Sequence, residues 1–124
     1  MDYQPDPSLN SQIRFLITAL NFHHIDPERV KVLRSYGTKT RRILARIHTL
    51  SKPLQKGLSH PPGYVIEVLS ENFDRLPEQE KTKTLIHELL HIPHSFGGGF
   101  RQHRPYVNKK IVEKAYKKMM KSIE

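Results

Sequence analysis

The stretch from Pro77 to Ile92 restricts the fold of this chain more than any other part of the sequence. On a helical wheel at about 100° per residue, its apolar residues fall on one arc and its polar residues on another. The apolar arc holds Leu85, Ile86, Leu89, Leu90 and Ile92. Pro77 suits the first turn of a helix, and Pro93 interrupts one. The sequence therefore predicts a helix over 77–92 with one buried side.

The opposite arc of this predicted helix carries His87, Glu88 and His91. Histidines four residues apart lie one turn apart, so both imidazoles are able to reach one zinc ion at about 2.0–2.1 Å. Glu88 lies beside them, where a general base would take a proton from metal-bound water. The chain has no cysteine, so a metal must be bound by His, Asp or Glu. A zinc site with a catalytic glutamate is favoured over a surface helix with solvated side chains.

A catalytic zinc usually has three protein ligands, so one more ligand must be found. His94 follows Pro93 too closely to share the helix face, and Glu113 would lie on a later helix. His103 is favoured, because the glycines of 97–99 allow the chain to turn back under the helix. All three residues remain candidates on sequence grounds.

The rest of the chain shows both helical and strand periodicity. It predicts helices over 8–22 and 106–123 and strands over 29–37, 43–50 and 64–70. With 124 residues, the chain is most simply one domain, over 1–124, of the α+β class.

The net charge of +9 is unevenly distributed. Residues 29–56 carry nine Lys and Arg and no acid, and residues 101–124 carry eight against two. These two basic segments are either a solvated surface or a contact for an anionic partner such as nucleic acid. The sequence has no apolar run of about 18 residues and no signal peptide, so we expect a cytoplasmic protein that does not enter a membrane.

The sequence His87-Glu88-x-x-His91 matches the zincin signature. With its surroundings, YVIEVLS…FDRLPEQEKTKTLIHELLHIPHSFGGGFRQH, it resembles the small metallopeptidases of archaea and phages over residues 64–106. The resemblance implies a minimal zincin-like fold: an N-terminal helix, a short twisted sheet of three or four strands, the HExxH helix and a C-terminal helix. It implies zinc ligands at His87 and His91, suggests His103 as the third, and makes Glu88 the base. The chain is also distantly similar to SprT-type proteases, but it lacks their cysteine zinc ribbon.

In zincins the strand before the metal-binding helix borders the cleft and pairs with an extended substrate, which by resemblance would be 64–70 here. Arg101 and Tyr106 are further candidates, as groups that stabilise the oxyanion of a tetrahedral intermediate. The favoured function is a zinc-dependent peptidase that acts on proteins or peptides. The alternatives are a metal-dependent nuclease and a non-catalytic nucleic-acid-binding module with a structural zinc.

Overall fold

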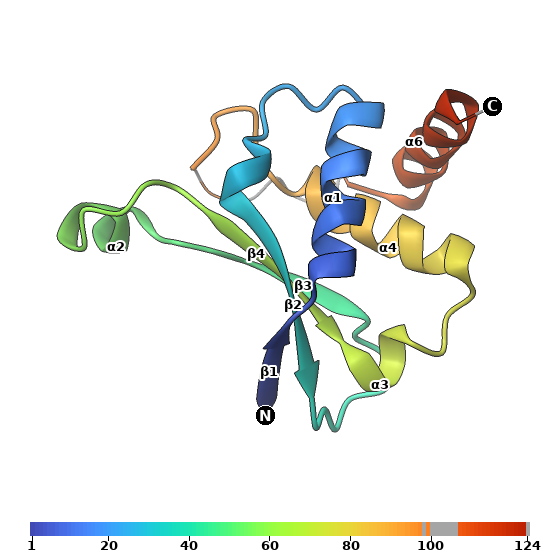
Figure 1. Ribbon diagram of the computed structural model, residues 1–124, viewed down its shortest axis with the longest axis horizontal. Helices are drawn as coiled ribbons and strands as arrows, with labels where there is room; N and C mark the ends of the chain where they lie inside the picture. The colour runs from blue at the N-terminus through green and yellow to red at the C-terminus, as the bar shows by residue number, and fades with distance from the viewer. Residues whose placement is uncertain (98, 100–106, 124) are drawn as a thin grey trace.

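The computed structural model describes residues 1–97, 99 and 107–123, which form an α+β structure (Figure 1). The strands of its four-stranded sheet are β1 Asp2–Pro5, β2 Val30–Tyr36, β3 Ala45–Thr49 and β4 Tyr64–Leu69. The helices are α1 Pro7–Ala19, the 3-10 helix η1 Pro27–Arg29, α2 Lys52–Gly57, α3 Ser70–Phe73, α4 Glu78–Leu90 and α6 Lys109–Ser122. The predicted α+β class is confirmed, and the arrangement is consistent with a small zincin-like fold. In the described part of the chain, no helix has the length and apolar character needed to cross a membrane.

The sheet is mixed and has the strand order β1-β2-β4-β3. β2 and β4 run parallel, while β1 is antiparallel to β2 and β3 is antiparallel to β4. The prediction that segment 64–70 borders the cleft as an edge strand is therefore wrong, because β4 lies between β2 and β3. Five of its six residues are buried, as expected for a central strand.

One face of the sheet, which we call the inner face, packs against the helices. It contributes Val30 and Val32 from β2 and Tyr64, Ile66 and Val68 from β4 to the core. The periodic apolar residues of the predicted helix over 8–22 are buried in this core: Ile13, Leu16 and Ile17 of α1, and its C-cap residue Leu20. α4 and α6 complete this layer, and Figure 1 shows both near α1, whereas α2 lies apart at the tip of the β3–β4 connection.

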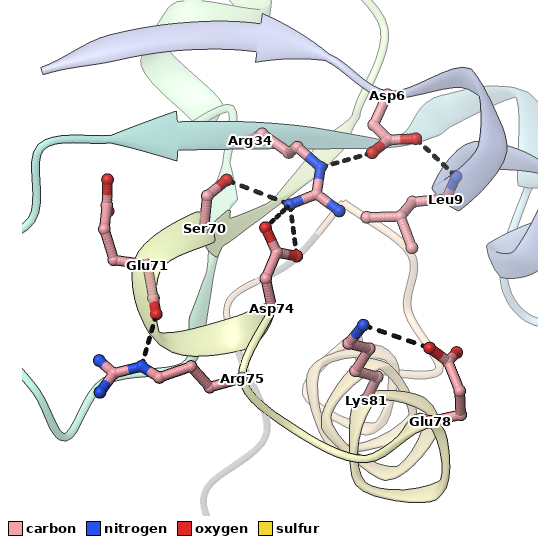
Figure 2. A network of polar contacts seen from close by, with 9 residues as sticks. All are labelled: Asp6, Leu9, Arg34, Ser70, Glu71, Asp74, Arg75, Glu78 and Lys81. Atoms are coloured by element: carbon pink, nitrogen blue, oxygen red, sulfur yellow. Dashed lines mark hydrogen bonds and ion pairs between the residues drawn. The ribbon is translucent and has the colours of Figure 1, made fainter.

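A polar network around Arg34 ties the sheet to the segment that leads into α4 (Figure 2). The Arg34 guanidinium donates hydrogen bonds to Asp6 at 2.6 Å, to Asp74 at 2.8 Å and to the Ser70 hydroxyl. Asp6 is at the same time the N-cap of α1, where its carboxylate accepts from the backbone N–H of Leu9. The network thus joins β2, the start of α1 and the end of α3, just before the segment that leads into α4.

Candidate active site

The end of α4 brings the three motif residues together. His87 and Glu88 lie in its last turn, and His91 is its C-cap. The apolar side of the helix is held in the core, because Leu85, Ile86, Leu89 and Ile92 are fully buried. The buried apolar side that the sequence predicts is thereby confirmed, apart from Leu90, which is only partly buried, and Glu88 and His91 on the polar arc are buried as well.

The imidazoles of His87 and His91 face each other. Their Nε2 atoms are 3.3 Å apart, and the rings meet edge to face with centroids 5.0 Å apart. Two nitrogens at about 2.0–2.1 Å from a tetrahedral zinc ion are about 3.3–3.4 Å apart, since the angle between them is about 109°. The separation of the two Nε2 atoms therefore fits a pair of zinc ligands.

Glu88 is the buried carboxylate next to this histidine pair. It is 7 % exposed, and burial raises its pKa to about 7. Among the described residues no lysine, arginine or histidine forms an ion pair with it. A carboxylate in this position is able both to accept and to give back a proton near neutral pH.

His87 and Glu88 line one cleft of about 730 Å³. Its opposite wall is the start of β3 and the residues before it, Leu44 among them, and Val112 of α6 lies at its side. The sequence alone does not reveal this wall, because residues 44 and 88 lie too far apart along the chain for a local pattern to link them. The cleft has the size of an ordinary ligand-binding site.

The alternative ligand Glu113 also lines the cleft, but it belongs to an ion pair. Lys83 Nζ lies 2.8 Å from Glu113 and 3.6 Å from Glu80, and it also lies over the ring of Tyr116. The hydrogen bond from Lys83 lowers the pKa of Glu113. The first role that the structure gives to Glu113 is to tie α6 to α4.

The alternative ligand His94 lies against another histidine. Its ring centroid is 4.4 Å from that of His24, whose Nε2 is 3.2 Å from the backbone carbonyl of Ile92. Within residues 1–97, 99 and 107–123, no three or more His, Cys, Asp or Glu residues form a group that could hold a metal ion. The predicted third ligand His103, like Arg101 and Tyr106, lies outside the described residues, so the roles of these three stay predictions.

The chain turns sharply after α4 at Gly97. This residue has a φ of +98°, and its N–H donates to the Tyr64 hydroxyl at 3.0 Å. A Cβ at this position would lie 2.8 Å from the Pro62 ring, so both the backbone angle and the packing require glycine. Gly97 is thus a turn residue that only glycine fits, while the predicted return of the chain under the helix to His103 stays a prediction.

A family model described as "Putative phage metallopeptidase" matches residues 1–123. No curated protein and no solved structure matches the chain. The family match includes the N-terminal half, which lies outside the stretch 64–106 on which the motif resemblance rests.

Proposed function

This chain belongs to the family described as "Putative phage metallopeptidase", and we propose that it is a zinc peptidase of the HExxH type. The observation that carries the proposal is the geometry at the end of α4. The Nε2 atoms of His87 and His91 have the separation of a zinc-ligand pair, and the buried Glu88 lies in the same cleft as His87.

His87, His91 and His103 would hold the metal. A zinc ion there supplies a Lewis acid that polarises the scissile carbonyl and makes water more acidic. Glu88 takes a proton from the water that attacks this carbonyl and delivers it to the nitrogen of the leaving amine. Its burial suits both steps, because burial raises the pKa of this carboxylate, as is needed for a group that acts first as base and then as acid.

The substrate would lie along β3. This strand pairs with β4 through one edge, and in the described part of the sheet no strand occupies its other edge. The cleft with His87 and Glu88 reaches the start of this strand at Ala45. An extended peptide would add to the edge through backbone hydrogen bonds, which gives affinity that depends little on side chains. Arg101 and Tyr106 stay candidates for contacts with the oxyanion.

The first experiment is the zinc content of the purified protein, measured by mass spectrometry beside hydrolysis of an unfolded protein substrate. We expect about one zinc per chain in the wild type and a near-complete loss in His87→Ala and in His103→Ala. His60→Ala is the matched control, since this exposed histidine does not line the cleft, and it should keep the metal. His94→Ala should keep it too.

Two results would contradict the proposal. Zinc that remains bound in His87→Ala would mean that the metal sits elsewhere. Zinc that binds as expected, in a protein that cleaves nucleic acid but no peptide, would favour the nuclease alternative.

A further inference from the structure

The face of the sheet opposite the core, which we call the outer face, has a different character from the inner face. Because side chains alternate along a strand, the neighbours of the core residues point to this face. They include Lys31 and Leu33 of β2, Val65 of β4, and Arg46 and His48 of β3, all paired across the sheet in register. None of them belongs to the core cluster that the helices form.

A second cavity of about 410 Å³ lies at one end of this outer face, and we call it the Lys31 pocket. Arg29, Lys31, His48 and His60 line it together with the apolar side chains of Leu50 and Val65. Arg29, Lys31, His48 and His60 are all exposed. A small apolar surface surrounded by exposed basic groups is suited to a ligand that is flat and apolar in one part and anionic in another.

The carboxylates near the Lys31 pocket already have partners. Glu28 lines it, but its carboxylate pairs with Arg14 at 2.7 Å. Glu67 is buried on the same face, where Arg46 and His48 bond it at 3.0 and 2.8 Å. Among the described residues, no carboxylate forms an ion pair with Arg29 or Lys31. Both cations help to lower the pKa of Glu28, whose main partner is Arg14, but neither forms an ion pair of its own, so each is still able to contact an anion.

Basic residues continue beyond the pocket. α2 begins two residues after Leu50 and carries the exposed Lys52 and Lys56, and Figure 1 shows it projecting away from the other helices. Exposed cations therefore occur both at the pocket and on α2, at the tip of the β3–β4 connection. Cations on two neighbouring elements suit a ligand with several anionic groups in series.

From these observations we propose that the Lys31 pocket binds a nucleotide unit of a single-stranded nucleic acid. Its base would lie on Val65 and Leu50, its phosphate would contact Arg29 and Lys31, and the following phosphates would contact the lysines of α2. Single strands are favoured over a duplex because only an unstacked base is able to enter a pocket of this size. The pocket lies on the opposite face of the sheet from α4, so such binding would leave the cleft at Glu88 open.

The test is fluorescence anisotropy with labelled single-stranded DNA and RNA of about 20 nucleotides, titrated with the full chain at several salt concentrations. We expect the double variant Arg29→Glu/Lys31→Glu to weaken binding at least about tenfold. The slope of log affinity against log salt concentration should become less steep by roughly 1 to 2. The matched control is Lys114→Glu/Lys121→Glu, an equal charge change on exposed residues of α6, which should bind almost as the wild type does. Circular dichroism would verify that both variants are folded.

Competition with unlabelled ligands is the second part of the binding test. A 12-nucleotide strand should displace the probe at a far lower concentration than adenosine monophosphate, because only the strand reaches α2. The proposal would be overturned if the two double variants lost affinity for the strand equally, or if the wild type showed no measurable binding. Displacement by the mononucleotide as efficient as by the strand would also overturn it, as would tighter binding to anionic lipid vesicles than to either nucleic acid. His87→Ala should bind the probe normally, which makes this test independent of the peptidase proposal.

Discussion

Two buried glutamates lie on opposite sides of the structure, and their surroundings differ in one respect. Glu67 on the outer face is bonded by Arg46 and His48, and although burial raises its pKa, these hydrogen bonds outweigh that effect and hold the pKa at about 2. Glu88 in the cleft has no such partner among the described residues, and burial raises its pKa to about 7. A paired buried carboxylate is fixed in its charged form and contributes to stability. An unpaired one is costly to the fold but remains able to exchange a proton.

Replacing each carboxylate by its amide tests this difference most directly. Glu88→Gln should lower kcat/KM for peptide hydrolysis by about 10²- to 10⁴-fold, because it removes the general base. Its zinc content should not change, and the metal-free variant should be at least as stable as the wild type, since it no longer buries an unpaired ionisable group. Glu67→Gln, assayed at a pH and temperature at which it is folded, should keep its peptidase activity.

Peptide hydrolysis that survives unchanged in Glu88→Gln would show that this glutamate is not the base. Loss of zinc in the same variant would show that Glu88 is a ligand. The two results are separable because activity and metal content are measured on the same preparation.

The second prediction concerns the stability that Glu67 provides. Its folded pKa of about 2 lies below the ordinary value of 4.5, so the stabilisation is present above about pH 4.5 and is lost as the pH falls toward 2. The shift corresponds to at most about 3 kcal/mol. Glu67→Gln should lose a large part of this at pH 7 and should show a flatter pH dependence, as measured by urea unfolding between pH 2 and 7. Glu78→Gln, at an exposed glutamate, is the control.

An unfolding free energy that falls equally steeply with acid in Glu67→Gln and in the wild type would contradict this account. In that case the acid sensitivity would come from another carboxylate, with Asp6 the first to examine, because Leu9 and Arg34 lower its pKa.

The third prediction concerns the turn that leads out of the active-site helix. Gly97→Ala should destabilise the protein by at least about 1 kcal/mol, because alanine disfavours the left-handed backbone region. The close approach to Pro62 adds to this cost. Thermal unfolding should show the loss, and Gly57→Ala, where a Cβ meets no atom, is the matched control. Equal melting temperatures for the wild type and Gly97→Ala would show that the turn tolerates a side chain.

Local patterns in the sequence predicted much of the fold. α1, β2, β4 and α4 follow from apolar periodicity, because each has one side or both sides buried along its length. β1 was missed because all four of its residues are exposed. α2 was missed because Pro53 and Gly57 are typical of a connector. The order of the strands was beyond local reasoning, because the pairing of β3 with β4 joins residues about 20 positions apart.

The candidate site also has one part that local sequence patterns predict and another part that they do not. His87, Glu88 and His91 were found because they lie within one turn of a helix, where spacing in sequence fixes spacing in space. The far wall of the cleft, and the partners that distinguish Glu67 from Glu88, come from other elements of the sheet. Neither could be predicted without knowing that β3, and not β4, is the edge strand.

The weakest effect on activity is predicted for a third glutamate, Glu113, which lines the cleft but is paired with Lys83. Glu113 pairs with Lys83 and is partly exposed, so by the reasoning applied to Glu67 it should be a structural group. Glu113→Gln should therefore leave zinc content unchanged and alter peptide hydrolysis little, since a partly exposed ion pair contributes weakly. Zinc analysis and a kinetic assay of the same sample would verify this. A loss of zinc would mean that Glu113 exchanges Lys83 for the metal, and the rule that separates paired from unpaired carboxylates would then fail inside the cleft itself.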